Sequence, residues 1–221
     1  MASEESYPAL ISLAVHELRT PANIVWGYLK MLQRDGQSTL GANERHLVEQ
    51  AEKSCARLAE LVAELSDVGN LDAGQAPMAR RRVDLFGLVG EAAAGSHEGE
   101  DRGVRVDVRG QSTGAILEGD PDRLRPALAA LIRSVAREQP GPCTIVVDRQ
   151  RTATAGTNTA VIIMAHEARV QEADAGSAAF NDKRGGLGLA LPIARRVIEA
   201  HGGRLRSRAD GGVTISVPLA T

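Results

Sequence analysis

Two apolar stripes in the first third of the chain constrain the fold most strongly, because each repeats with alternating steps of four and three residues. The first stripe consists of Ile11, Val15, Leu18, Ala22, Val25, Leu29 and Leu32. The second consists of Leu47, Ala51, Ser54, Leu58, Leu61, Leu65 and Val68. Three further apolar residues widen the second stripe: Val48, Cys55 and Val62. Steps of this kind place side chains on one face of an α-helix, so the pattern predicts two long helices joined by a turn within residues 34–43.

A single helical hairpin cannot bury two stripes of this length, whereas two hairpins paired in a four-helix bundle can. We therefore expect residues from about 8 to 70 to form a homodimer. Gly74 is a plausible stop for the second helix, and Pro77 follows just beyond it. These signals predict a first domain over residues 1–76 and a second over residues 77–221.

The second domain carries a mixed pattern of helices and strands. Helices are expected at residues 83–98, 120–139 and 187–201. Strands are expected at residues 103–109, 143–150 and 159–165, with a terminal hairpin over residues 204–219 that turns at Asp210-Gly211-Gly212. This order predicts a sheet with helices packed on one face, and hence an α+β chain overall.

Composition excludes several classes of protein. The net charge of -2 gives no basic surface for nucleic acid. Two cysteines far apart in sequence, Cys55 and Cys143, do not form a disulfide framework and fit a reducing compartment. No apolar run approaches the roughly 18 residues of a membrane span, and the acidic first ten residues lack the apolar core of a signal peptide. We therefore expect a cytoplasmic chain without a membrane segment.

The first predicted helix contains an unusual run, His-Glu-Leu-Arg-Thr-Pro, over residues 16–21. His16 follows Val15 and so leaves the apolar stripe, and Thr20 lies one turn further on the same face. Pro21 lacks an N–H group and should bend the helix. A neutral imidazole is a good nucleophile near neutral pH, and a neighbouring carboxylate such as Glu17 can hold the proton of its other nitrogen. An isolated histidine on a helix surface, however, most often has no chemical role.

The run over residues 16–21 closely resembles the H-box of the sensor histidine kinases of two-component signalling. Three later segments also resemble parts of that family: residues 119–132 its N-box helix, residues 185–203 its second glycine box and the following helix, and residues 211–219 its last strand. The resemblance covers nearly the whole chain. It implies a dimerisation and phosphotransfer hairpin, followed by an α/β sandwich similar to the ATP-binding domain of these kinases.

The resemblance also implies roles for the residues of the H-box run. His16 would be the phosphoacceptor, Glu17 its general base or orienting residue, and Thr20 the residue that positions water for phosphatase action on a partner. The expected partner is the receiver domain of a response regulator, whose aspartate exchanges the phosphoryl group. His46, on the second helix, is the next candidate if His16 is not the acceptor.

The segment that resembles the N-box departs from the family. The family has two asparagines on this helix, one of which helps to hold Mg²⁺, and the matching positions here are Ala130 and Ser134. Alanine has no ligand oxygen, and serine is shorter than an asparagine amide. Arg137 matches the basic residue that follows. The departure predicts the loss of the metal ligand.

The two glycine boxes depart as well. Ala165 stands where the family has the aspartate that accepts a hydrogen bond from adenine, and Glu167 and Arg169 stand where it has glycines. A ligand donor left unpaired costs about 1–3 kcal/mol. In the second box Arg184 replaces the first glycine, while the other glycines of a vestigial nucleotide loop are retained: Gly186 and Gly188. A displaced adenine-binding aspartate at Asp174 is a weaker reading, since this residue does not directly follow the strand.

Taken together, these departures predict that neither ATP nor Mg²⁺ binds, since catalysis with a Mg²⁺-nucleotide depends on metal and positioning for most of its rate. No metal site is expected. The sequence favours a histidine phosphotransferase that acts through His16. Two alternatives stay open: an active ATP-dependent kinase with a divergent nucleotide site, and a non-catalytic scaffold that binds a response regulator.

Overall fold

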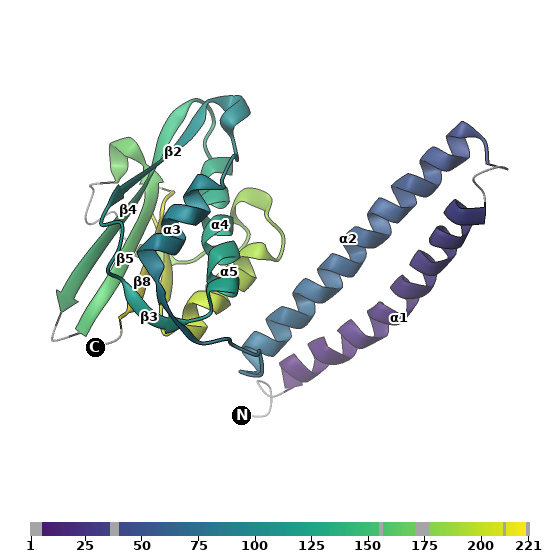
Figure 1. Cartoon of the computed structure of the whole chain (residues 1–221), viewed down its shortest axis with the longest axis horizontal. Helices are drawn as coiled ribbons and strands as arrows, with labels where there is room; N and C mark the ends of the chain where they lie inside the picture. Colours follow the sequence, from purple (N-terminus) through teal and green to yellow (C-terminus); the bar gives the residue numbers. More distant parts are fainter. Residues whose placement is uncertain (1–5, 36–39, 155–156, 171–176, 210, 220–221) are drawn as a thin grey trace. The chain divides into compact units, whose positions relative to one another are not determined.

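The computed structural model describes residues 6–35, 40–154, 157–170, 177–209 and 211–219. The chain divides into two compact units, Met1–Ala76 and Pro77–Thr221 (Figure 1). Each unit is described by itself. No helix within the described residues combines the length and the apolar character needed to cross a membrane.

The first unit is a hairpin of two long helices, α1 (Ser6–Asp35) and α2 (Ala42–Asp72). The backbone N–H of Gly41 donates to the carboxylate of Glu44 at 2.5 Å, which satisfies one of the free donors at the start of α2. At the other end, Gly74 has a φ of 66°, a conformation that glycine adopts at little cost after a helix. Helix α2 therefore begins and ends at local stabilising features.

Close packing between α1 and α2 is concentrated in a small apolar cluster. Ile11, Val15 and Val62 are buried together, with Leu65 at the edge of the cluster. A Cβ atom on Gly69 would lie 3.0 Å from Cγ2 of Ile11, so the absence of a side chain at this position lets the helices approach. The hairpin thus buries one narrow face of each helix.

The remaining apolar residues of both helices lie outside this cluster. Leu18, Val25 and Leu32 are 45%, 51% and 51% exposed, and on α2 Leu47 and Leu58 are 59% and 44% exposed. The residues of α2 that face α1 include Cys55 and Val62, which the sequence placed only at the flank of the second stripe. A second apolar face therefore remains uncovered in a single hairpin.

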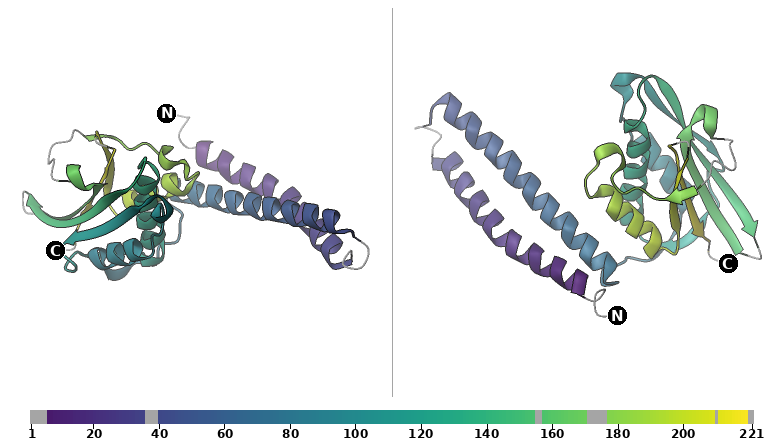
Figure 2. Two further views of the ribbon diagram at one scale, coloured as in Figure 1. Left: turned by 90° about the horizontal axis from the view of Figure 1, so that it is seen from above. Right: turned by 180° about the vertical axis from the view of Figure 1, so that it is seen from behind.

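Helix α1 continues through Pro21 without interruption. Figures 1 and 2 show that α1 is bowed, whereas α2 is nearly straight. Proline has no N–H group to donate to the carbonyl oxygen four residues earlier, here that of Glu17, so the helix loses one hydrogen bond one residue after His16. The bow therefore has a local cause within the H-box run.

The second unit is built around a six-stranded sheet with the order β2-β4-β5-β8-β7-β6. Its strands are β2 (Val104–Gly110), β4 (Cys143–Thr154), β5 (Thr157–His166), β6 (Ser177–Ala179), β7 (Arg204–Arg208) and β8 (Val213–Pro218). β2 and β4 pair in parallel, and the other neighbours are antiparallel. A separate two-stranded sheet pairs β1 (Arg81–Asp84) with β3 (Ile116–Gly119).

Three helices cover one face of the large sheet (Figures 1 and 2). They are α3 (Leu85–Ala94), α4 (Pro121–Arg137) and α5 (Ala190–Ala200). Short 3₁₀ turns occur at Glu100–Arg102, Glu167–Arg169 and Arg184–Gly186. The chain is therefore α+β, a helical hairpin followed by a helix-covered sheet, which confirms the predicted fold class.

The core of the second unit lies between the sheet and these helices. Large side chains that are fully buried include Phe86, Leu128, Leu131, Ile132, Ile162, Met164, Leu191, Ile198 and Ile215. The apolar residues of α4 and α5 recur at helical spacing, those of β8 alternate, and β5 carries a continuous apolar run. This packing of helices on the sheet brings the end of β5, the end of α4 and the turn before α5 into one region.

A polar cluster fastens the start of α4. The carboxylate of Asp120 accepts hydrogen bonds from the backbone N–H groups of Asp122 and Arg123 at 3.0 and 3.2 Å, and from that of Ala79 at 2.9 Å. The backbone N–H of Asp120 in turn donates to Nε2 of His201, at the end of α5, at 2.9 Å. Burial alone would raise the pKa of Asp120, but the three backbone donors together with the positive charge of Arg123 outweigh it and the pKa is lowered.

Candidate functional site

His16 projects from α1 with its side chain 77% exposed, directly after the buried Val15. The neighbouring Glu17 side chain is 72% exposed, and its Oε1 lies 3.4 Å from Nδ1 of His16. When Nδ1 carries the proton, Glu17 accepts its hydrogen bond and Nε2 keeps a lone pair for an incoming group. The arrangement suits an exposed nucleophile whose orientation is biased by a carboxylate.

Thr20 is also exposed, one helical turn beyond His16 and on the same face of α1. The described structure therefore brings His16 and Glu17 into contact and places Thr20 beside them on α1. His46, the alternative acceptor, is exposed near the start of α2. Both histidines are exposed, so exposure does not distinguish them as acceptors. The contact with a neighbouring carboxylate, Glu17, is made by His16.

The two residues of α4 at the N-box asparagine positions are buried. Ala130 is 2% exposed and Ser134 is fully buried. The hydroxyl of Ser134 donates to the carbonyl oxygen of Leu131 at 2.7 Å, so its proton is used within the helix. A Cβ atom on Gly185 would lie 3.1 Å from Cα and from the carbonyl oxygen of Ser134. The loop of the second glycine box therefore lies directly on α4 and leaves little space for a ligand there.

Arg184 fills the space beside this contact. Its side chain is 5% exposed, and Nη2 contacts the carboxylate of Glu138 and the carbonyl oxygen of Gly211. Nη1 donates to the carbonyl oxygen of Gly212 at 3.2 Å. The guanidinium thus joins the end of α4 to the turn between β7 and β8. The sequence marks Arg184 as a departure from glycine, but it does not reveal these partners, which lie 27 to 46 residues away.

A cavity of about 620 Å³ lies near this arginine, at the end of β5. His166 lines the cavity together with Glu138 and Gly211, whereas Ala165 does not. The register explains this difference, because successive residues of a strand point to opposite faces, and His166 shares the face of the buried Met164. His166 is therefore the residue that faces the cavity, next to the position that sequence comparison assigned to the adenine-binding aspartate.

The imidazole of His166 does not replace that aspartate. Its Nδ1 accepts a hydrogen bond from the backbone N–H of Ala168 at 3.1 Å, so a neutral ring carries its proton on Nε2. A ring in this tautomer donates through Nε2 and cannot accept a hydrogen bond from an adenine amino group. The acceptor that the family uses is thus missing at both Ala165 and His166.

The residues at the former glycine positions have other partners. Glu167 pairs with Arg109 of β2, and this hydrogen bond is the main reason that the pKa of Arg109 is raised. The carbonyl oxygen of Arg169 accepts a hydrogen bond from Nη2 of Arg208 at 3.0 Å. Asp174, the displaced candidate, lies outside the described residues. These contacts fix Glu167 and Arg169 within a 3₁₀ turn rather than a flexible glycine loop.

Gly186 and Gly188 keep the backbone conformation for which glycine is suited, with φ values of 61° and 59°. Both are exposed, and they lie in the turn that leads into α5. No group of three or more His, Cys, Asp or Glu side chains in the described part of the chain is arranged to hold a metal ion. The two glycines thus keep a turn geometry that suits glycine, at the start of α5.

Comparison with known proteins places these features in context. Residues 9–74 match the His Kinase A (phospho-acceptor) domain family. The probable sensor histidine kinase TcrY of Mycobacterium tuberculosis is 29% identical over 99% of this chain and 47% of its own length. Sensor protein CutS of Streptomyces coelicolor is 29% identical over 93% of this chain and 51% of its own length. The chain therefore spans about half the length of these curated relatives.

Solved structures share the fold. The crystal structure of full-length ShkA in complex with AMPPNP aligns with a TM-score of 0.68 and 22% identity, over 97% of this chain and 46% of that one. The Acinetobacter baumannii histidine kinase AdeS aligns with a TM-score of 0.51 and 18% identity, over 93% of this chain and 97% of that one. At these identities the alignments show a shared architecture of hairpin and helix-covered sheet.

Proposed function

This chain belongs to the sensor histidine kinase family of two-component signalling, and we propose that it exchanges a phosphoryl group with a response-regulator receiver domain through His16, without ATP. The observation that carries the proposal is a contrast within one chain. His16, the proposed phosphoacceptor, is exposed beside a carboxylate, whereas the buried guanidinium of Arg184 occupies the region where the family resemblance places the nucleotide loop.

The hairpin carries what phosphotransfer requires of this partner. The imidazole of His16 is accessible, and Glu17 can stabilise the proton on Nδ1 while Nε2 attacks phosphorus. In such a transfer the Nε2–P bond forms as the bond between phosphorus and the receiver aspartate breaks. The receiver and its Mg²⁺ supply most of the charge stabilisation, so little further machinery is needed from this chain.

The second unit supports the exclusion of ATP. Ala130 and Ser134 offer no metal ligand, and His166 presents a donor where adenine needs an acceptor. Glu138, which pairs with Arg184, places a carboxylate beside the cavity. A nucleotide would have to displace a partly buried ion pair without gaining the contacts that hold a nucleotide in this family.

The direct test uses receiver domains from the source organism, each phosphorylated with a labelled small phosphodonor. We expect one receiver to label the wild-type chain, His16→Ala to abolish the label, and His46→Ala to retain it. Label that persists in His16→Ala but disappears in His46→Ala would show that His46, and not His16, accepts the phosphoryl group. If no receiver labels the wild-type chain, while one still binds it equally well with and without His16, the chain is a scaffold.

A second candidate function is an ATP-dependent sensor kinase with a divergent nucleotide site. It is favoured by the similarity to curated sensor histidine kinases and by the shared fold with ShkA, which was solved with AMPPNP. Calorimetry with Mg²⁺-ATP and autophosphorylation with labelled ATP distinguish the two functions. We expect neither binding nor labelling, and sub-millimolar binding accompanied by label on His16 would establish the kinase instead.

A further inference from the structure

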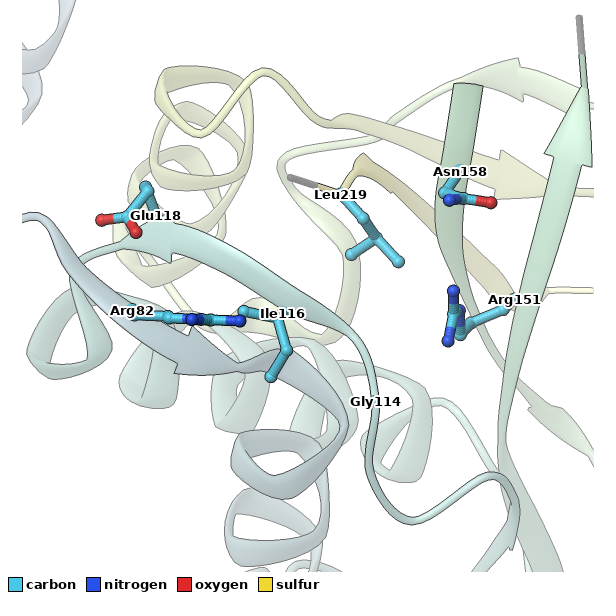
Figure 3. A pocket seen from close by; sticks show the side chains of 7 residues that line it. All are labelled: Arg82, Gly114, Ile116, Glu118, Arg151, Asn158 and Leu219. Atoms are coloured by element: carbon cyan, nitrogen blue, oxygen red, sulfur yellow. The ribbon is translucent and has the colours of Figure 1, made fainter. Parts of the chain in front are cut away.

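A separate pocket of about 420 Å³ lies in the second unit, where the small β1–β3 sheet meets the β4–β5 hairpin and the residue after β8 (Figure 3). Its lining consists of Arg82, Gly114, Ile116, Glu118, Arg151, Asn158 and Leu219. None of these residues lines the cavity at His166. The volume falls in the range of about 300–1,000 Å³ that small-molecule sites occupy.

Two guanidinium groups reach this pocket from different sheets. Arg82 belongs to β1, and its Cα partner across the ladder is Glu118 of β3, yet the two side chains form no ion pair. Figure 3 shows the carboxylate of Glu118 turned away from the guanidinium of Arg82, which extends along the strand toward Ile116. The carboxylate of Glu118 therefore lies on the neighbouring strand but does not pair with the guanidinium of Arg82.

Arg151 enters from β4 on the other side of the pocket (Figure 3). Its Nη1 lies 3.6 Å from the position that a Cβ atom on Gly114 would take, so its head group leans over a residue without a side chain. Within the described part of the chain, the guanidinium groups of Arg82 and Arg151 have no hydrogen-bond or ion-pair partner, although the backbones of both residues pair in their sheets. Two guanidinium groups against the single carboxylate of Glu118 leave the lining with a net positive charge, which favours the entry of an anion.

The rest of the lining adds an apolar wall and a fixed rim. Ile116 is half-buried, and Leu219 is 9% exposed with its branched end directed into the pocket in Figure 3. The backbone N–H of Leu219 donates to the carbonyl oxygen of Asn158 at 2.8 Å, which holds this wall against β5. A ligand that fits both parts would carry a charged oxygen group on an apolar body.

We propose that this pocket binds a small organic anion, with its carboxylate or phosphate held between Arg82 and Arg151 and its apolar body against Ile116 and Leu219. A guanidinium group matches the geometry of both oxyanions. An inorganic ion has no apolar body to contact Ile116 and Leu219, so we expect it to bind more weakly than an organic anion. The proposal does not depend on phosphotransfer through His16, and either can fail without the other.

The probes are inorganic phosphate, phenyl phosphate and benzoate, titrated into the full ¹⁵N-labelled chain at constant ionic strength, because exposed charges are screened by salt. We expect phenyl phosphate or benzoate to shift the amide signals of Gly114, Ile116, Asn158 and Leu219 at millimolar concentrations or below. Inorganic phosphate should bind at least tenfold more weakly than phenyl phosphate. The tighter of the two aromatic anions then identifies the preferred head group.

Three variants distinguish binding of the anion in this pocket from non-specific binding to exposed arginines. Arg82→Gln and Arg151→Gln should each weaken binding of the preferred anion by about tenfold, which corresponds to loss of one charged hydrogen-bond partner. Arg105→Gln, a matched change at an exposed arginine of β2 outside the pocket, should have no effect. The proposal is overturned if no aromatic anion shifts the four amides, or if Arg105→Gln weakens binding as much as the pocket variants do.

Discussion

Arg184 and Glu138 form an ion pair in which the guanidinium is 5% exposed and the carboxylate is 33% exposed. The pair connects the 3₁₀ turn before α5 to the residue that follows α4. Because the guanidinium also donates to Gly211 and Gly212, three segments that are distant in sequence meet at this side chain. Arg184 therefore has a structural role at the position where the family has a glycine beside its nucleotide.

The first prediction follows from this burial. Arg184→Met should lower the free energy of unfolding of the second unit by about 2–3 kcal/mol, because two carbonyl oxygens and a partly buried carboxylate lose their donor. Hydrogen exchange of α4 and α5 amides measures the change. The fluorescence of Trp26 is unsuitable, since this single tryptophan lies in the hairpin and reports on the first unit.

Arg125→Met is the matched control. Arg125 pairs with Glu91 at 3.0 Å, but both side chains are about half exposed, so loss of this pair should cost less than about 1 kcal/mol. Equal destabilisation by the two variants would contradict a special role for Arg184. We also expect Arg184→Met to remain unable to bind Mg²⁺-ATP, because His166 and Ser134 still lack the family's contacts.

The second prediction concerns assembly. We expect light scattering after size exclusion to give twice the chain mass of 23.3 kDa. Val25→Asp should yield a monomer, because Val25 is 51% exposed in the single hairpin and an added carboxylate would be buried between two copies. Asn23→Asp adds the same charge at an exposed polar position and should leave the dimer intact. A wild-type monomer at micromolar concentration would exclude this assembly.

The hairpin shows how far periodicity alone can predict a structure. The alternating steps correctly indicate two long helices, because such steps require a helical repeat. They do not show which apolar residues face the other helix of the same chain. Val62 lies in the buried cluster although it only flanks the second stripe, whereas Leu58 of the stripe is exposed. One stripe of α2 contacts α1 and the neighbouring stripe stays exposed in the single hairpin, and a sequence pattern does not distinguish the two.

The second unit shows a different limit. The helices at residues 120–139 and 187–201 and the longer strands are detectable, since each has a regular apolar pattern or a clear cap such as Asp120. The short strands β1, β3 and β6 have too few residues to carry a pattern. The contacts of Arg184 and the orientation of His166 depend on register and on distant turns, so local sequence does not predict them.

The third prediction concerns pH. Burial is the main reason that the pKa of His201 lies below its ordinary value of 6.5, and nearby Arg80 and Arg123 lower it further despite Asp120 and the hydrogen bond to Val197. Nδ1 donates to the carbonyl oxygen of Val197 at 2.6 Å while Nε2 accepts from the N–H of Asp120, so the folded state holds the neutral ring.

The unfolded chain therefore binds a proton at His201 more readily than the folded chain. This contribution to stability is complete above pH 6.5 and declines as the pH falls from there toward the lowered pKa of the folded state. Urea unfolding of α4 and α5 at about pH 7.5 and about pH 5.5 should reveal a loss of stability at the lower pH. His201→Gln keeps an acceptor for the N–H of Asp120 but does not titrate, so this variant should lose less stability between the two pH values. An identical loss in both proteins would contradict the assignment.

The fourth prediction concerns Glu17. Glu17→Gln keeps an oxygen that can accept a hydrogen bond from Nδ1 of His16 but removes the charge that stabilises the imidazolium. We expect the rate of transfer from a phosphorylated receiver to fall by about tenfold, at the weak end of acid–base effects because the contact is 3.4 Å long and exposed. Glu49→Gln, an exposed change on α2, is the control. Transfer at the wild-type rate across the pH profile would exclude a role for Glu17.

The fifth prediction separates transfer from loss of phosphate to water. Thr20 is exposed on the same face of α1 as His16, so its hydroxyl can hold a water molecule near a docked receiver without contacting the imidazole that accepts the phosphoryl group. Thr20→Ala should leave labelling of His16 unchanged and slow the net release of inorganic phosphate from the phosphorylated receiver. Thr20→Ser keeps the hydroxyl and should release phosphate at close to the wild-type rate. If Thr20→Ala slows labelling and release by the same factor, Thr20 acts on docking rather than on water, because a docking defect lowers every reaction of the complex alike.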